Sequence, residues 1–161
     1  MVSWTSPFFT ELSLEQLYAI LRARQEVFIV EQNCVFLDAD GVDQHCWHVM
    51  GWEHRPPAGE ILIAYARIVP PAVKYDEASI GRVISTNAGR KQGFGKELMR
   101  RAVAKTEELF PGQAIRIGAQ QYLEGFYAGF GFQTVSTPYI EDGIFHVEML
   151  RPAPIQTRGV S

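Results

Sequence analysis

The sequence predicts a single α/β (α+β) domain: a mixed, mostly antiparallel sheet with a central parallel βαβ pair, flanked by helices. Three observations lead to this prediction. Strand, helix and strand follow one another over 80–119, which is typical of a parallel, right-handed βαβ unit. Two apolar segments within 47–69, separated by prolines, indicate an antiparallel strand pair. The 161 residues are enough to bury one sizeable core.

The first half of the chain predicts one helix and two strands. Ser13 and Gln16 have the spacing of a capping box, which predicts a helix from about Leu14. Apolar residues then recur at helical intervals at Leu14, Leu17, Tyr18, Leu21 and Phe28. A turn-rich connection over 33–44 precedes strands at 47–52 and 61–69, and Pro70-Pro71 ends the second strand.

The second half predicts the parallel unit and a closing set of short elements. We expect strands at 80–85 and 114–119, with a polar loop from Thr86 to Gly95 and an amphipathic helix between them. A short helix over 122–128 follows. The final strands are expected at 132–136 and 145–150, which leaves 151–161 as a loose tail after a domain spanning 1–150.

Composition limits the classes of function. With 47% hydrophobic and 20% charged residues and no long apolar run, the chain is neither disordered nor membrane-spanning. The first ten residues do not resemble an export signal, so we expect a cytoplasmic protein, with both cysteines as thiols. A net charge of -3 argues against partners such as nucleic acid or an acidic membrane. Locally, six basic residues and one acidic residue lie between 90 and 105, which favours a small anionic ligand.

The segment Arg90-Lys91-Gln92-Gly93-Phe94-Gly95 lies between a strand and the start of a helix. Free backbone N-H groups and the helix dipole suit a phosphate there, and the glycines permit close approach. A P-loop is excluded because Glu97 follows Lys96, and a dinucleotide fingerprint is excluded because Leu98 stands where a glycine is needed.

The remaining pattern, R-x-x-G-x-G, resembles the acyl-coenzyme A loop of the GNAT acetyltransferase superfamily. Downstream, Gln120-x-x-Leu123-x-x-Phe126-Tyr127-x-x-x-Gly131-Phe132 resembles a second motif of that superfamily, with Gln120 at the position usually held by Asn. Across 4–150 the chain also resembles the ElaA group of GNAT proteins. The segments that carry this resemblance are 21–34, 38–41, 64–67, 80–83, 118–120 and 141–144.

The resemblance implies a GNAT acyl-CoA acyltransferase fold and transfer of an acyl group, expected to be acetyl, from acetyl-CoA to a small amine by direct attack in a ternary complex. Strands 80–85 and 114–119 are then expected to splay, with the pantetheine arm between them. Backbone near Val83 and Ile84 would bind its amides and polarise the thioester carbonyl. The residues implied in coenzyme A binding are Arg82, Val83, Ile84, Arg90, Lys91, Gln92, Gly93, Phe94, Gly95, Lys96, Gln120, Phe126 and Tyr127.

Tyr127 is implied as the general acid for the leaving thiolate, because a phenol is protonated at neutral pH. The general base is not fixed by any motif. The chemically able residues are Glu31, His48, Asp76, Glu141, Asp142 and His146, of which Glu31 and His146 are the first to test. For the acceptor, a small pocket of mixed charge is expected where several polar residues converge: Arg24, Glu31, Gln32, the 38–43 loop, Arg67, Glu141 and the rest of the segment to His146. The alternative is that Arg24, Arg67 and the acids form an ion-pair framework that only braces the loop.

We expect no metal site, because Cys46 and His48 make only half of a tetrahedral set and the aspartates at 38–43 lack the ligand spacing of a calcium loop. Two functions stay open. The first is an acyl-CoA-dependent N-acyltransferase, and the alternative is a non-catalytic module that binds acyl-CoA as a sensor. The sequence also leaves open whether the chain forms a homodimer.

Overall fold

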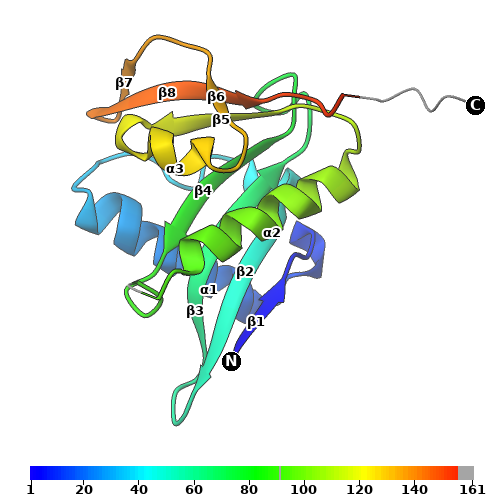
Figure 1. Ribbon diagram of the computed structural model, residues 1–161. Coiled ribbons are helices and arrows are strands. Elements are labelled where there is room, and N and C mark those ends of the chain that lie inside the picture. Colours follow the sequence, from blue (N-terminus) through cyan, green and yellow to red (C-terminus); the bar gives the residue numbers. More distant parts are fainter. Residues whose placement is uncertain (91, 156–161) are drawn as a thin grey trace, which may run out of the picture.

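The computed structural model describes residues 1–90 and 92–155, which form two antiparallel sheets (Figure 1). The first sheet holds its strands in chain order: β1 (Val2–Thr5), β2 (Trp47–Arg55), β3 (Gly59–Val69) and β4 (Ser79–Ser85). The second has β8 at its centre, paired with the other three: β5 (Ile115–Gln120), β6 (Gln133–Thr134), β7 (Tyr139–Glu141) and β8 (Ile144–Arg151). The α-helices are α1 (Leu14–Arg24), α2 (Phe94–Leu109) and α3 (Glu124–Ala128).

The two sheets meet where β4 and β5 begin. A parallel bridge joins Ala78 to Ile115, and the Arg116 N-H donates a hydrogen bond of 2.9 Å to the Ala78 carbonyl. Beyond this bridge, no backbone pairing joins the described residues of β4 and β5. The predicted fold class is confirmed. The parallel pairing of β4 and β5 is limited to this one bridge, because the two strands then diverge.

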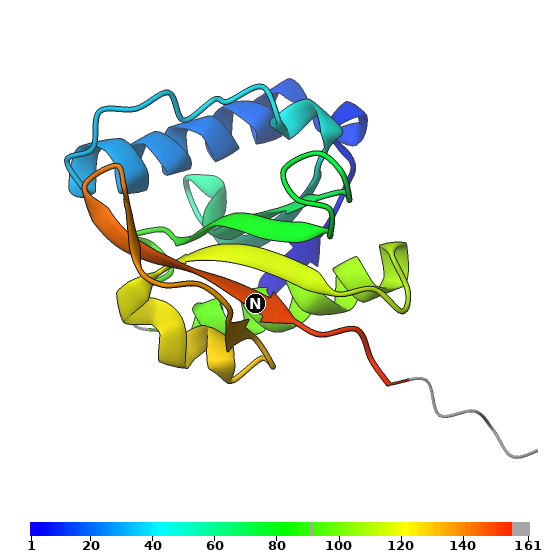
Figure 2. The same cartoon turned by 90° about the horizontal axis from the view of Figure 1, so that it is seen from above.

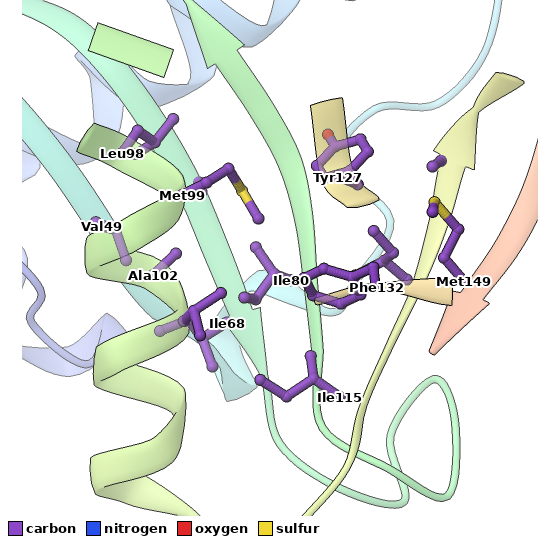
Figure 3. Close-up of a cluster of buried hydrophobic side chains, with 14 of the residues drawn as sticks. Val49, Ile68, Ile80, Leu98, Met99, Ala102, Ile115, Tyr127, Phe132 and Met149 are labelled. Atoms are coloured by element: carbon purple, nitrogen blue, oxygen red, sulfur yellow. The ribbon is translucent and has the colours of Figure 1, made fainter. Parts of the chain in front are cut away.

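The helices cover both faces of the sheets. Figure 2 shows α1, in blue, on one side and α2 and α3, in green and yellow, on the other. The larger core lies under α2, where Leu98, Met99 and Ala102 pack against sheet residues such as Ile68 and Ile80 (Figure 3). A smaller core under α1 is formed by Ile20, Ala23, Val27, Met50, Leu62, Tyr65 and Ile84.

The start of α1 has the predicted capping box. The Ser13 hydroxyl accepts a hydrogen bond of 3.1 Å from the Gln16 N-H, and the Gln16 side chain accepts one of 2.9 Å from the Ser13 N-H. At its other end α1 continues as a π-helical segment, Gln25–Glu31, which the sequence does not distinguish from α-helix. This segment matters for the site because it brings Phe28 and Glu31 to the edge of a cavity.

Several strand bounds differ from those predicted. β2 extends to Arg55, because its charged end still pairs with β3 in the solvent-exposed hairpin. β6 spans only Gln133–Thr134, and β7 was not predicted. β8 includes Arg151, which the sequence assigns to the tail; its guanidinium donates to the Phe130 carbonyl at 2.9 Å. The rest of the predicted tail from 156 onward lies outside the described residues.

Within the described chain, every helix is too short or too polar to cross a bilayer.

Candidate active site

A cavity of about 810 Å³ opens where β4 and β5 part. Arg90, in the loop before α2, and Gly95, in the first turn of α2, line one end of it. Lys74 and Tyr75, in the β3-β4 connection, line the other end. The π-helical segment forms a third wall through Phe28 and Glu31. The cavity therefore joins the predicted phosphate loop to Glu31, Arg67 and Glu141, which were predicted for the acceptor.

A β-bulge in β4 forms part of the cavity wall. Tyr65 pairs with Ile84 and Arg67 with Gly81, so Arg82 and Val83 together stand opposite one residue of β3. Arg82 has a φ of +50°, which is uncommon for a residue with a side chain. On its other edge, β4 has no strand partner among the described residues beyond the Ala78 bridge. Unpaired backbone N-H and C=O groups are therefore available along the cavity.

The loop before α2 has the geometry expected of an anion-binding turn. Gly93 precedes the helix with a φ of +75°, and a Cβ there would meet no atom of the described structure within 4 Å. Gly95 lines the cavity, and Phe94 is half-buried. Gln92, Gly93 and Lys96 are exposed beside the cavity mouth, while Lys91 lies outside the described residues.

Arg90 is held across the cavity mouth by three acceptors. It donates hydrogen bonds to the Ser85 carbonyl at 3.2 Å and to Asn87 Oδ1 at 2.9 Å. Its Nη2 also lies 2.5 Å from Glu31 Oε2. This ion pair links the loop before α2 to the end of the π-helical segment, so an anion that binds Arg90 would compete with the Glu31 carboxylate.

Tyr127 lies in α3 on the far side of the gap from β4. The residue is only 7% exposed, and its ring packs edge-on against Phe126. It also packs edge-on against Phe132 (Figure 3). Burial, with a smaller contribution from Tyr122, raises the pKa of Tyr127 to about 12. The hydroxyl makes no hydrogen bond to another described residue, although Tyr127 lines the cavity. It is therefore a protonated, unengaged donor at neutral pH.

His146 and Gln120 line the same cavity from adjacent strands. They are register partners in β8 and β5. His146 Nδ1 lies 2.8 Å from the Ile144 carbonyl, which can only accept, so Nδ1 carries the proton and Nε2 is the free nitrogen of the neutral ring. Nε2 faces Glu141 at 3.8 Å. The Gln120 side chain donates to Gln32 Oε1 at 3.3 Å and so fixes the π-helical segment to β5.

Beside the cavity, three arginines and three aspartates form an ion-pair cluster that is buried except at Asp40 and Arg82. Arg24 contacts Asp38 at 2.9 Å and Asp43 at 2.6 Å. Arg67 contacts Asp40 at 2.7 Å and Asp43 at 2.9 Å. Burial alone would raise the pKa of Asp43, but hydrogen bonds and charge from Arg24 and Arg67 lower it instead. The cluster thus holds the 38–43 loop against α1 and β3.

Arg82 connects this cluster to the cavity. Its Nε donates to Asp38 at 2.9 Å, and its Nη2 lies 3.4 Å from Asp40. The guanidinium also lies 5.6 Å from the ring centre of Phe36. The side chain is thus directed to the acidic loop, where Phe36 and Asp40 also line the cavity.

His48 is buried against the ion-pair cluster. Its Nε2 lies 3.0 Å from the Asp43 carbonyl and must donate to it, so Nδ1 accepts from the Tyr65 hydroxyl at 2.7 Å. Both ring nitrogens are engaged and the side chain is inaccessible, so His48 is unsuited to act as a general base. Burial lowers the pKa of His48 below its usual value.

This arrangement predicts a loss of stability in mild acid. The unfolded chain takes up a proton on His48 below about pH 6.5, whereas the folded chain resists it, so the free energy of unfolding should fall as the pH drops. A second loss should follow below about pH 4, because the folded-state pKa values of Asp40 and Asp43 are lowered. When folding lowers a pKa by 1, the free energy of unfolding at high pH is larger by about 1.4 kcal/mol.

Urea unfolding between pH 7.5 and 3 measures both losses. A His48→Gln variant should lack the loss in mild acid and keep the loss below pH 4. Equal pH dependence of wild type and variant between pH 7.5 and 5 would contradict the role given to His48.

Comparison with known proteins identifies the family. A family model described as an acetyltransferase (GNAT) domain matches residues 59–151, more than half of the chain. The chain belongs to the GNAT family. Protein ElaA of Escherichia coli is 39% identical over 153 residues, which cover 94% of this chain and 97% of ElaA. A UPF0039 protein of Synechocystis is also 39% identical over 153 residues, with 95% and 97% covered.

Solved structures agree with this assignment to the GNAT family. An acyl-CoA N-acyltransferase from Pseudomonas aeruginosa gives a TM-score of 0.86 at 38% identity and covers 94% of this chain and 99% of that chain. The crystal structure of Escherichia coli ElaA gives 0.85 at 38% identity with the same coverage. The resemblance to the ElaA group is therefore confirmed.

Most residues that the GNAT resemblance assigns to the donor lie around one cavity. Those that line it are Arg82, Val83, Ile84, Arg90, Gly95, Gln120, Phe126 and Tyr127. Of the predicted acceptor residues, Glu31, Arg67 and Glu141 line it as well. The assignment of Arg24 to the acceptor needs correction: its side chain is fully buried, is bound by Asp38 and Asp43, and does not line the cavity.

The structure adds cavity residues that the sequence reasoning missed. Lys74 and Tyr75 follow Pro70-Pro71 in a connection that has neither periodicity nor a GNAT motif. The Tyr139 hydroxyl lies close to Gly118, another cavity residue, and belongs to the unpredicted strand β7. The sequence offered one signal for these residues. Lys74 and Tyr75 place a cation next to an aromatic hydroxyl in the connection between two predicted strands, and both groups can bind a ligand.

Proposed function

We propose that this GNAT protein is an acyl-CoA-dependent N-acyltransferase that moves an acetyl group from acetyl-CoA to a small amine by direct attack. One observation carries the proposal. The open edge of β4, with its bulge at Arg82 and Val83, faces a buried, unengaged Tyr127 across a cavity that begins at the N-terminus of α2. An open strand edge, a phenol able to donate a proton and a turn that suits an anion lie along one channel, and this supports the proposal.

The donor would lie along this channel with its pyrophosphate at the turn before α2. Backbone N-H groups of the turn, the helix dipole and Arg90 all favour a negative charge there. Glu31 would release Arg90 as the phosphates bind. The pantetheine amides would then pair with the free edge of β4, as an added strand does. A bulge N-H near Val83 would stabilise the negative charge that develops on the thioester oxygen.

In the transfer step the acceptor nitrogen attacks the thioester carbon and forms the C-N bond, while the C-S bond breaks. The departing sulfur takes a proton from the Tyr127 hydroxyl, and the nitrogen loses one to a base. His146 Nε2 supports the role of base because it is unprotonated in the neutral ring and lines the cavity. The Glu31 carboxylate becomes available for the same role when Arg90 binds the phosphates.

An acceptor screen tests this function. Release of free thiol from acetyl-CoA, and from longer acyl-CoA donors, is followed over pools of small amines, amino acids and peptides. Calorimetry measures donor binding in parallel. We expect binding with turnover of at least one small amine. Binding without turnover in any pool would favour the sensor alternative, and absence of binding would reject both.

Replacing Gly93 by valine should weaken coenzyme A binding by at least about tenfold, because the side chain would occupy the space of the pyrophosphate and remove the left-handed conformation. Gly59→Val is the matched control, since Gly59 has a φ of +83° and equally open surroundings in the β2-β3 turn. It should lose similar stability and keep its affinity. Calorimetric affinities that are equal in the two variants would contradict the placement of the phosphates.

A further inference from the structure

Lys74 is a positive charge without a partner at the end of the cavity remote from α2. It lies in the β3-β4 connection and lines the cavity together with Tyr75 and Ser79. Within residues 1–90 and 92–155 it has no ion-pair partner within 4 Å. The aspartates of the neighbouring cluster are already bound by Arg24, Arg67 and Arg82. Lys74 is exposed to solvent at the cavity wall, so its charge is accessible to an anionic ligand.

The surroundings of Lys74 favour an anion. Burial and then the charges of Arg67 and Arg82 lower the pKa of Lys74, against smaller opposite contributions from Asp40 and Glu141. At Lys74 the two arginines thus have a larger effect than the two nearby carboxylates. A bound anion would relieve the repulsion among these three cations.

Two tyrosine hydroxyls add uncharged donors at this end. A Cβ on Gly118 would lie 3.2 Å from both the Tyr75 and the Tyr139 hydroxyl oxygens, so the two hydroxyls converge over this residue of β5. Neither has a hydrogen-bond partner in the described part of the chain. Burial, with smaller contributions from the Glu141 and Glu148 carboxylates, raises the pKa of both phenols, that of Tyr139 to about 12, so both stay protonated and able to donate at neutral pH.

We propose that the acceptor carries a carboxylate as well as its amine, and that Lys74, with the Tyr75 and Tyr139 hydroxyls, binds this carboxylate. The inference rests on the proposed N-acyltransferase function and names its substrate class: amino acids and other small amino carboxylates. The cavity then holds the acceptor by its anionic end. Its amine is left to face the part of the wall that holds Glu31 and His146.

Paired acceptors test this class directly. Amino acids are compared with the corresponding amines that lack the carboxylate, using kcat/KM for thiol release from acetyl-CoA. Wild type should prefer the carboxylate form by about 10- to 100-fold, the range expected for a hydrogen bond to a charged group. Lys74→Met should abolish this preference by slowing the carboxylate form alone, and Lys74→Arg should restore most of it. Lys105→Met is the control and should behave as wild type, because Lys105 is half-buried on α2, is paired with Glu108 and does not line the cavity.

Labelling provides a readout that needs no turnover. Lys74 is modified by an amine-reactive ester in the presence of coenzyme A and either acceptor pool, and mass spectrometry measures its modification relative to Lys105. Amino carboxylates should protect Lys74, and amines without a carboxylate should not. Protection without turnover would retain the carboxylate site and reject catalysis. Three results would overturn the carboxylate site. The first is equal kcat/KM for the two acceptor forms in wild type, and the second is an equal loss of kcat/KM for both forms in Lys74→Met. The third is a failure of both pools to protect Lys74 from modification.

Discussion

Replacement of Tyr127 by phenylalanine should lower kcat by about 10²- to 10⁴-fold, the usual contribution of one general acid. The phenol has no hydrogen-bond partner among the described residues, so its removal leaves no buried polar group unpaired. The ring contacts with Phe126 and Phe132 are retained. We therefore expect coenzyme A affinity and thermal stability to change little. Steady-state kinetics and calorimetry on the same preparation separate the two effects.

The matched control for this prediction is Tyr18→Phe, which makes the same chemical change on the exposed face of α1. It should leave kcat unchanged. If Tyr127→Phe binds coenzyme A and turns over like wild type, Tyr127 serves only in packing, and another donor must protonate the leaving thiolate.

Replacement of Arg24 by methionine should lower the free energy of unfolding by about 3–5 kcal/mol, the cost typical of removing one partner from a buried ion pair. Methionine fills much of the space of the arginine but leaves Asp38 and Asp43 with one cation fewer each. Both carboxylates are nearly inaccessible to water, so solvent cannot replace the guanidinium. Urea unfolding at neutral pH measures the loss.

Arg22→Met is the control for Arg24, because Arg22 lies two residues earlier in α1 and makes an exposed ion pair with Glu26 at 3.2 Å. Its loss should cost no more than about 0.5 kcal/mol. A similar small cost for both variants would show that the cluster does not hold the 38–43 loop as inferred.

Local signals in the sequence predicted the parts of the fold that depend on local chemistry. The Ser13 capping box forms because both of its partners lie within one turn. Gly93 adopts the left-handed conformation just before α2, where the spacing of the glycines indicated a turn. The motif that contains Gln120 and Tyr127 also predicted residues of the cavity, because it resembles a GNAT motif whose residues lie around one site.

The partners of charged side chains could not be predicted in this way. Arg22 and Arg24 look alike in the sequence, yet one is exposed and the other is fully buried. The difference arises because Asp38 and Asp43 fold back over α1 from 14 and 19 residues away. Lys74 lies in a connection without periodicity, so only the folded chain places it in the cavity.

The bulge in β4 was also beyond the reach of the sequence. Arg82 adopts a positive φ, but an arginine gives no sign of this in the sequence, as a glycine would. The extra residue in β4 depends on how β3 and β4 align. The predicted use of backbone near Val83 came from the resemblance to GNAT proteins. That use stays a prediction, to which the structure adds a specific geometry.

A crystal structure of the protein with coenzyme A tests the central claim most directly. We expect the pyrophosphate at the turn before α2, the pantetheine arm along the free edge of β4, and the sulfur within about 3.5 Å of the Tyr127 hydroxyl oxygen. We also expect Arg90 to leave Glu31 for a phosphate. Coenzyme A bound outside the gap between β4 and β5, or with its sulfur remote from Tyr127, would contradict the account.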